Sequence, residues 1–403
     1  MGLKSKVDLV GAFFCWLIVI WPVQTYSAER PNVVLILADD LGYTDISPFG
    51  SEINTPNIAQ LAAEGLSFTN YHTAQNCGPA RAMLLTGVDS HRNGVPNIPE
   101  SIPPEQMVYD HYKGVLNDKV VTISSLLKDN GYHTYMTGKW HLGHTPSLLP
   151  SSRGFDRTIA MADTGADNWE QRTYLPIYDQ VSWYADGSPH TLPDDFYSSK
   201  YFIDKTIEFV ASNEDSDQPF FAYIPFQAVH IPVQAPKEYS DKYAGVYDEG
   251  WSVMREKRRQ TAVALGVIPK ESEIKVTPGI IDWSSMTDEQ RRYDARRMEV
   301  YAGMVDAMDF HIGRLMDYLK SITSNIPLVN ENSLPKKLKD NPQGTCVIGL
   351  TTEPERLAEI RKNRMNSLKE TENKNYTNIE NITKEIIDAR KTFQKYRWPV
   401  IDV

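Results

Sequence analysis

Apolar residues are grouped along the first 320 residues of the chain in two ways, as short continuous runs and as positions spaced three or four apart. The run at 32–38 is aliphatic on both faces, which is typical of a central strand in a largely parallel sheet. Further strands are predicted at 66–71, 132–137 and 220–225. Helical spacing predicts helices at 57–64, 80–85, 120–130 and 298–319.

Two stretches lack such regular patterns. Residues 145–198 are rich in Pro, Asp and Tyr, so we expect an irregular region that contributes to substrate selection at the rim of a site. Residues 237–291 predict a long excursion from the main fold, with Trp251 and Trp283 as its anchors.

The composition is that of a soluble globular protein. The chain has 403 residues, of which 41% are hydrophobic and 23% are charged, enough for one large domain or two ordinary ones. The net charge of −10 argues against nucleic acid as a partner, because phosphate binding needs a basic excess. Three cysteines, one of them in a leader, are too few for a disulfide framework. Any anionic ligand must therefore be held by local cations.

The first residues have the order of a secretory signal peptide. Lys4 and Lys6 precede an apolar run at 10–23, and small residues follow at 25–28. The run is too short for a comfortable membrane span. We therefore expect residues 1–28 to be a signal peptide and the protein to be periplasmic or secreted, with no stable membrane span after cleavage. An uncleaved anchor is the alternative.

One thiol, one fixed backbone bend and one permanent cation lie within five residues. Pro79 fixes its own φ and favours an extended Gly78, so Cys77 is placed close to the start of the helix predicted at 80–85. A helix N-terminus attracts anions, and the guanidinium of Arg81 can bind two oxygens at once. The segment suits an oxyanion such as sulfate or phosphate. Alternatively, Cys77 is a small buried hydrophobe, the commoner state of a lone cysteine.

Polar residues follow the carboxyl ends of three predicted strands, where ligands bind in open α/β sheets. Asp39 and Asp40 follow the first strand, and adjacent carboxylates suit Ca²⁺ or Mg²⁺, although they also occur in caps and turns. Lys139 and His141 follow the strand at 132–137, and His230 follows the strand at 220–225. A lone Lys or His is more often solvated or structural.

The Gly-Lys pair at 138–139 does not make a phosphate loop. Gly131 lies seven residues before Gly138, whereas the phosphate loop needs five, and Trp140 stands where a Ser or Thr must bind the metal. A nucleotide-binding role for this segment is therefore excluded.

Three of these segments resemble signatures of the type I sulfatases, the formylglycine-dependent arylsulfatases. Cys77, Pro79 and Arg81, continued by Leu-Thr-Gly at 85–87, resemble the first signature. The GKWHLG stretch at 138–143 resembles the second, and an H-x-P-x-x-x-P pattern that begins at His230 matches a third element. The resemblance covers about residues 30–320 and implies an alkaline-phosphatase-like sandwich, an α/β fold with a mixed, mostly parallel central sheet.

The resemblance also implies the chemistry of the site, which is hydrolysis of an aryl or carbohydrate sulfate ester. Cys77 would be oxidised to formylglycine by a formylglycine-generating enzyme and would become the nucleophile. Ca²⁺ or Mg²⁺ would be held by Asp39, Asp40 and the group derived from Cys77. Four further residues would act on charge and protons, with Arg81 and Lys139 stabilising charge, His141 taking the proton that releases sulfate, and His230 protonating the leaving alcohol.

The pattern breaks after the long predicted helix. The family's Ser-Asp-Asn-Gly strand, which completes the metal site, and a later sulfate-binding lysine have no counterpart here. The only Asp-Asn pair after that helix is Asp340-Asn341, in a polar loop with no strand before it. A Ca²⁺ site needs six or more oxygen ligands. We therefore expect an incomplete sulfatase domain at 30–322 with impaired or no activity, and a non-catalytic module for sulfated ligands is an alternative.

The last eighty or so residues resemble a different family. The segments 325–329, 347–357 and 398–403 resemble the C-terminal part of the regulatory kinase/phosphorylase of pyruvate, phosphate dikinase and phosphoenolpyruvate synthetase. Helical spacing at 354–364 and 379–393 predicts a folded, α-rich tail. We interpret 323–403 as the second part of a hybrid chain. That family's phosphate loop has no counterpart here, so a phosphotransferase fragment is the remaining alternative.

Overall fold

The computed structural model describes residues 30–176, 179–214, 216, 218–273, 275, 278–322, 349–368, 377–398 and 400–402. The predicted signal peptide, the segment 325–329 and the Asp340-Asn341 pair lie outside the described residues. None of the described helices is long and apolar enough to span a bilayer.

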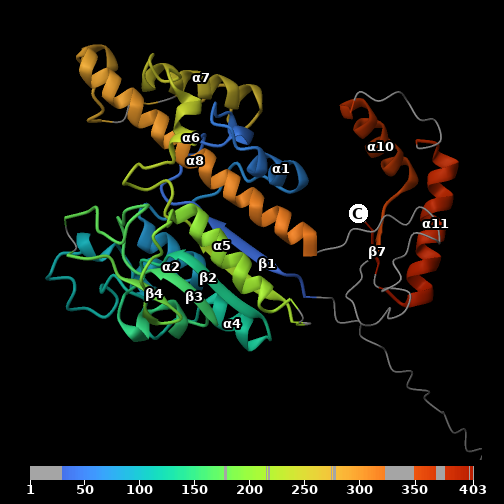
Figure 1. Ribbon diagram of the computed structural model, residues 1–403, viewed down its shortest axis with the longest axis horizontal. Coiled ribbons are helices and arrows are strands. Elements are labelled where there is room, and N and C mark those ends of the chain that lie inside the picture. Colours follow the sequence, from blue (N-terminus) through green and yellow to red (C-terminus); the bar gives the residue numbers. More distant parts are fainter. Residues whose placement is uncertain are drawn as a thin grey trace, which may run out of the picture.

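A six-stranded sheet forms the centre of residues 30–322, with its strands in the order β1-β6-β2-β3-β4-β5 (Figure 1). The first four strands in this order are parallel and the last two are antiparallel, so the predicted mixed, mostly parallel sheet is confirmed. The strands are β1 (Val33–Leu37), β2 (His133–Lys139), β3 (Arg157–Met161), β4 (Trp183–Ala185), β5 (Ser188–Pro189) and β6 (Phe220–Pro225).

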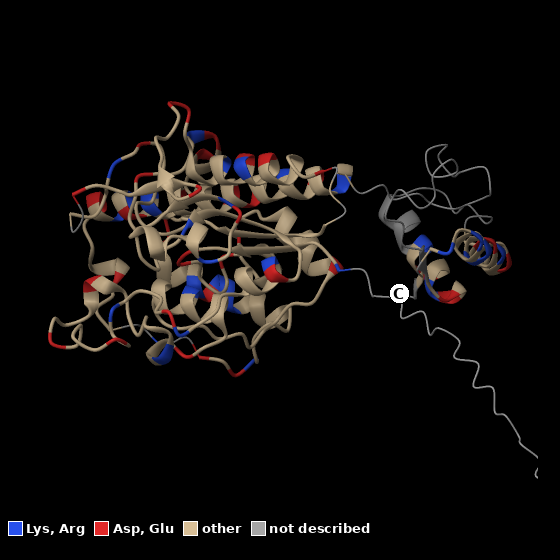
Figure 2. Cartoon of the chain, turned by 90° about the horizontal axis from the view of Figure 1, so that it is seen from below, with Lys and Arg blue, Asp and Glu red and all other residues tan. Residues whose placement is uncertain are grey.

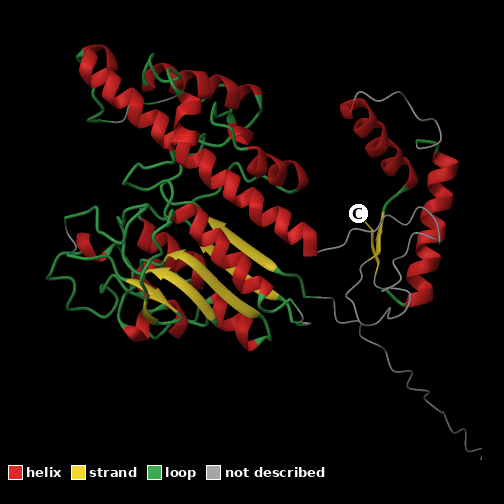
Figure 3. Cartoon of the chain, viewed as in Figure 1, coloured by secondary structure: helices red, strands yellow, loops and turns green. Residues whose placement is uncertain are grey.

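Helices cover both faces of this sheet, as Figure 3 shows. α5 (Ser198–Ala211) and α8 (Asp288–Ile322) pack on one face, and α2 (Cys77–Thr86) and α4 (Ile123–Asp129) pack on the other. Along β6, Ala222 and Ile224 enter the core under α5 and α8, whereas Phe221 and Tyr223 enter the core under α2. Successive side chains of a strand point to opposite faces, which is why a strand between two helical layers is apolar throughout.

Some of the other elements pack against α8, and others pack against α2 or against the sheet. The remaining helices are α1 (Pro56–Glu64), α3 (Ser90–Asn93), α6 (Lys237–Ser240) and α7 (Trp251–Ala264), and the 3₁₀ helices are η1 (Ser47–Phe49), η2 (Pro99–Ser101), η3 (Pro146–Leu148), η4 (Pro150–Ser152), η5 (Asp241–Tyr243) and η6 (Trp283–Ser285). The carboxylate of Asp309 in α8 accepts hydrogen bonds from the backbone N–H groups of Asn57 and Ile58, at 3.2 and 2.8 Å, and so caps α1. The rings of Trp251 and Trp283 pack edge to face with centroids 4.9 Å apart, as expected for the anchors of the excursion.

Three predictions about the strands are wrong. The run at 32–38 was predicted as a central strand, but β1 is the first strand in the order and pairs, among the described strands, with β6 alone. The segment 66–71 is not a strand, and its apolar side chains are solvent-exposed, with Leu66 87% and Phe68 72% exposed. It pairs with no described strand, and extended backbone without a partner gains no ladder hydrogen bonds. The region 145–198 is not irregular throughout, because it contains β3, β4 and β5. The apolar run that forms β3 is short and lies among polar and proline-rich residues, so its pattern did not predict a strand.

The tail is described by itself. β7 (Gly349–Thr351) pairs in parallel with β8 (Val400–Asp402), and α10 (Pro354–Leu368) contacts α11 (Ile379–Tyr396). Arg361 and Glu385 join the two helices by an ion pair of 2.7 Å, and Phe393 and Trp398 are buried. The α-rich tail predicted from helical spacing is therefore confirmed.

Candidate active site

The candidate residues are brought together by the topology of the sheet. β1, β2 and β6 are parallel, so the segments that follow Leu37, Lys139 and Pro225 leave the same edge. Backbone hydrogen bonds join these segments. The N–H of Asp39 donates to Ala228 O at 2.9 Å, and the N–H of Val229 donates to Asp39 O at 2.8 Å. Asp39, Asp40 and His230 therefore lie in neighbouring loops at this edge of the sheet.

Asp39 lies between two buried cations. Lys139 Nζ donates to Asp39 Oδ2 at 2.5 Å, and Arg81 Nη2 lies 3.0 Å from Asp39 Oδ1. All three side chains are at most 4% exposed. Burial alone would raise the pKa of Asp39, but the adjacent Arg81 and Lys139 outweigh it and hold that pKa well below its usual range. The carboxylate is therefore ionised at neutral pH, and its two cations leave this group of three side chains with a net positive charge.

Cys77 is the first residue of α2, one position after Asn76, its N-cap residue. Its Sγ lies 3.1 Å from Nδ1 of His141, which is buried. Burial raises the pKa of the Cys77 thiol, but His141 and Lys139 lower it more, so the net pKa is below its ordinary value. Residue 77 thus lies where a nucleophile can form, beside a base and at the positive end of a helix.

Asp40 and His230 lie at the outer part of this edge. Asp40 has a φ of 61°, which aspartate tolerates, and its Oδ2 lies 3.7 Å from His230 Nε2. His230 Nδ1 is 2.6 Å from Ile231 O, so this nitrogen donates and leaves Nε2 directed at the edge of the sheet, near Thr164 Oγ1 at 3.5 Å. Burial and Lys139 lower the pKa of His230 below its ordinary value. At neutral pH the ring is therefore neutral before any ligand binds.

One neighbour of the site was not predicted from the sequence. Glu100, in η2, has its Oε1 at 3.6 Å from His141 Nε2. A glutamate in a proline-rich loop is normally solvated, so no sequence pattern singled it out.

The residues described here do not complete a metal site. They contain no group of three or more His, Cys, Asp or Glu side chains placed to hold a metal ion. Both oxygens of Asp39 already face Arg81 and Lys139, and Asp40 adds one carboxylate. A Ca²⁺ ion takes six to eight oxygen ligands. Asp39 and Asp40 could form part of such a set, but they do not form a site by themselves.

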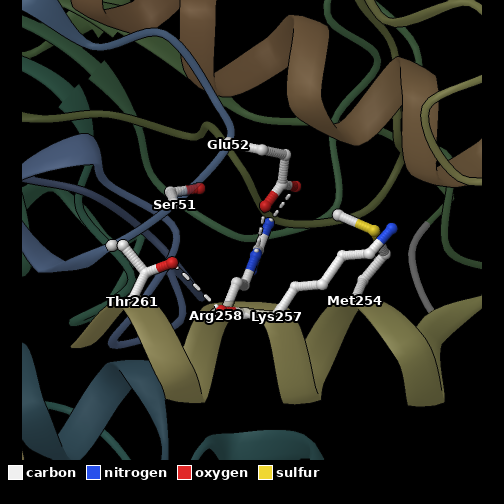
Figure 4. Close-up of a pocket in the computed structure, with 7 residues that line it drawn as sticks. Ser51, Glu52, Met254, Lys257, Arg258 and Thr261 are labelled. Atoms are coloured by element: carbon white, nitrogen blue, oxygen red, sulfur yellow. Dashed lines mark hydrogen bonds and ion pairs between the residues drawn. The ribbon is translucent and has the colours of Figure 1, made fainter. Parts of the chain in front are cut away.

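A cavity of about 170 Å³ lies between residues 50–52 and α7, and is not lined by the candidate residues (Figure 4). Arg258 points across it and donates to Glu52 from both Nε, at 2.7 Å, and Nη2, at 2.6 Å. A second ion pair joins Arg258 to Asp45, whose Oδ2 also accepts from the N–H of Gly42. The guanidinium is thus fully paired, and α7 stabilises the loop that follows Asp40.

These features define a class of protein, an α/β sandwich whose sheet edge gathers a cysteine at a helix start, a buried histidine and two buried cations. The sulfatase family model matches residues 31–328. The chain therefore belongs to the sulfatase family, and the resemblance seen in the signatures is confirmed.

Relatives of known sequence and structure agree. The chain is 43% identical over 312 residues to an uncharacterized sulfatase of Schizosaccharomyces pombe, covering 73% of this chain and 55% of that protein. It is 38% identical over 297 residues to the arylsulfatase of Klebsiella aerogenes, covering 72% and 63%. The crystal structure of Ps i-CgsB in complex with k-i-k-neocarrahexaose matches with 26% identity and a TM-score of 0.51, covering 73% and 56%. The chain thus spans between about half and two thirds of these relatives.

The tail matches a second family model, kinase/pyrophosphorylase, over residues 316–403. It is 69% identical over 81 residues to a Pelagibacter ubique protein named as a pyruvate, phosphate dikinase regulatory protein. This match covers 20% of the chain and 30% of that protein. The similarity predicted for the tail is therefore confirmed. In Figure 2 basic and acidic residues are interspersed along the coloured parts of the chain.

Proposed function

We propose that the site at the carboxyl edge of the sheet hydrolyses sulfate esters of aryl or carbohydrate alcohols. The observation that carries this proposal is the arrangement around residue 77, with His141 Nδ1 at 3.1 Å and the buried cations Arg81 and Lys139 on either side of Asp39. Membership of the sulfatase family and the similarity to an arylsulfatase support it.

Each side chain has a role in this proposal. Conversion of Cys77 to formylglycine by a formylglycine-generating enzyme would supply an aldehyde hydrate as the nucleophile. Arg81 and Lys139 stabilise negative charge on the sulfuryl oxygens, because charges held in a dry site act in a low dielectric. His141 accepts a proton at Nδ1, the nitrogen that faces residue 77. Because Nδ1 of His230 already holds the proton given to Ile231 O, His230 donates from Nε2 to the leaving oxygen once that nitrogen is protonated, and the negative charge of a bound sulfate ester favours this protonation.

We also propose that the chain as written has impaired activity. Asp39 and Asp40 would contribute two carboxylates to a Ca²⁺ or Mg²⁺ site, and the described residues offer no third ligand besides the group at position 77. A site short of ligands binds its cation weakly, so the charge of a bound sulfate would be neutralised by Arg81 and Lys139 alone.

The test is sulfate release from an aryl sulfate by the full chain, produced together with a formylglycine-generating enzyme. Slow release that Cys77→Ala abolishes would support the proposal. Release that is unchanged in Cys77→Ala would overturn it, and release as fast as that of the Klebsiella aerogenes arylsulfatase would overturn the proposed impairment.

A second candidate is a module that binds sulfated ligands without hydrolysing them. It is favoured by one observation, that the buried cations Arg81 and Lys139 are in place while the described residues form no metal site. Calorimetry would separate the two, because near-normal Ca²⁺ affinity favours catalysis, whereas binding of an aryl sulfate without metal and without turnover favours the module.

The leader and the tail carry two further proposals. We propose export of the mature protein to the periplasm or the medium, which N-terminal sequencing of the exported protein would test. Regulation of a dikinase through the tail is the other, supported by the similarity of residues 316–403. Retention of a dikinase by the immobilised full chain would support it, and absence of retention would count against it.

A further inference from the structure

Glu100 is directed at a buried nitrogen of the candidate active site. Its Oε1 lies 3.6 Å from Nε2 of His141, and the two side chains are 16% and 3% exposed. Nε2 of His141 makes no hydrogen bond to any described residue, and the carboxylate of Glu100 lies beside it. The other ring nitrogen, Nδ1, faces Cys77 Sγ at 3.1 Å. The ring thus lies between a carboxylate and the residue proposed to become the nucleophile.

The loop that carries Glu100 is joined to the start of α2. The side-chain amide of Asn76, the N-cap residue of α2, donates to Asn97 Oδ1 at 2.5 Å. The same oxygen accepts from the N–H of Ile98 at 2.9 Å, and the N–H of Ser101 donates to Ile98 O at 3.0 Å. Because Asn76 immediately precedes Cys77, this loop holds Glu100 and residue 77 in a fixed relation on opposite sides of one imidazole.

Burial lowers the pKa of His141, but Cys77 and Glu100 raise it more, so the ring accepts a proton only above that raised pKa, where it is neutral. A neutral imidazole carries its single proton on one nitrogen, and the polar groups beside its two nitrogens decide which. A carboxylate accepts only, so one beside Nε2 stabilises the tautomer with the proton on Nε2. Nδ1 is then left with a lone pair that points at residue 77. With no acceptor beside Nε2, either nitrogen can carry the proton, and the fraction of rings able to accept at Nδ1 falls.

We propose that Glu100 is a positioning residue, which holds the Nε2–H of His141 and so keeps Nδ1 as a proton acceptor toward residue 77. Its contact with His141 is independent of any reaction, whereas its effect on catalysis rests on the proposed function. Glu100 does not touch residue 77 and acts through the histidine alone.

The structural part is tested by nitrogen NMR of histidine-labelled full chain carrying Cys77→Ala, so that neither conversion nor turnover takes place. Glu100→Gln keeps an oxygen acceptor in a side chain of the same length, and Glu100→Met keeps the length without one. Glu105→Ala, an exposed glutamate in the same loop, is the matched control. His141 is assigned by the loss of its signal in His141→Gln.

We expect the Nε2–H tautomer of His141 to predominate in the chain that keeps Glu100 and in Glu105→Ala. It should persist in part in Glu100→Gln. In Glu100→Met we expect a mixture of the two tautomers. An unchanged tautomer in Glu100→Met would overturn the proposal. Circular dichroism of each variant confirms that the comparison is made on folded protein.

The catalytic part is tested in the converted chain with Cys77 intact. We expect Glu100→Met to lower kcat for an aryl sulfate by roughly 10- to 100-fold, which is the usual cost of losing a carboxylate partner behind a functional histidine. KM should stay within about twofold. Glu100→Gln should recover part of the loss. An unchanged kcat, or a change in KM alone, would overturn the role in catalysis. If the unaltered chain releases no sulfate, the proposed function fails, and the NMR result still decides whether Glu100 sets the tautomer.

Discussion

The buried group of Asp39, Arg81 and Lys139 makes a quantitative prediction about stability. Lys139→Met removes one cation and keeps much of the side chain's volume. Asp39 then retains Arg81 at 3.0 Å but loses the 2.5 Å contact to Lys139, in a site where these side chains are at most 4% exposed. Removing one partner of a buried ion pair typically costs about 3–5 kcal/mol. Because Arg81 remains, we expect a loss of about 3 kcal/mol in the free energy of unfolding.

The assay is urea unfolding at neutral pH, supported by thermal unfolding. A loss of about 3 kcal/mol corresponds to a fall in Tm of roughly 6–12 °C for a domain of this size. Lys119→Met, at an exposed lysine, is the control and should change the free energy of unfolding by less than about 0.5 kcal/mol. In a double-mutant cycle with Asp39→Asn, we expect the double variant to be less destabilised than the sum of the single ones, by about 1–3 kcal/mol. Additive losses would refute the claim that Asp39 and Lys139 stabilise each other.

The ion pairs of Asp39 with Arg81 and Lys139 also make the free energy of unfolding depend on pH in the acid range. The pKa of Asp39 is lowered on folding, so its contribution is present above the unfolded pKa of about 4 and is lost as the pH falls toward the folded value. In Lys139→Met the folded pKa rises because a cation is gone. The variant therefore has less of this contribution to lose on acidification, and the difference in stability between it and the unaltered chain should narrow below about pH 4. A difference that stays constant to pH 3 would contradict the reasoning.

Three further predictions follow from the site and the core. In the unconverted chain Cys77 should react with iodoacetamide at pH 7 faster than a free thiol of ordinary pKa. His141→Ala should slow this reaction by roughly tenfold, because His141 lowers the pKa of the thiol. Equal rates in the two proteins would contradict this. Calorimetry with CaCl₂ should give a Kd no tighter than about 10⁻⁴ M, because the ligand set is incomplete, and a micromolar Kd would show that ligands have been overlooked. Phe68→Ala should change the free energy of unfolding by less than about 0.5 kcal/mol, because Phe68 is exposed. Phe202→Ala, at a fully buried site, should lower it by about 3–5 kcal/mol. Similar losses in the two variants would mean that residues 66–71 are packed against the core.

Much of the fold could be predicted because two of its strands are continuous apolar runs. β1 and β6 were each predicted as a strand for that reason, and β6 is buried on both faces. The segment 66–71 alternates apolar and polar residues as far as Thr69, as a half-buried strand does, but a strand also needs a neighbour, which is a property of the tertiary structure and not of local sequence. β3 shows the reverse, a short run that becomes a strand because β2 offers its free edge.

The candidate site was predictable to the extent that motifs carried it. Lys139 ends β2, and His141 and His230 follow strands that end at one sheet edge, where parallel strands bring such segments together. Cys77 and Arg81 instead reach this edge on α2, which follows no described strand. The mutual geometry was not predictable. That both oxygens of Asp39 face cations depends on distances between elements a hundred residues apart. Glu100 was missed for the same reason, since its position depends on contacts of its loop with the start of α2.

The central claim is that residue 77 is the nucleophile position of a sulfatase site, and mass spectrometry of the peptide that contains it tests this most directly. The full chain is produced together with a formylglycine-generating enzyme, and Arg81→Ala is analysed alongside it. We predict that the peptide from the unaltered chain carries an aldehyde in place of the thiol and reacts with a hydrazide. A peptide that retains only the Cys77 thiol, while a known sulfatase produced in the same cells is converted, would contradict the account.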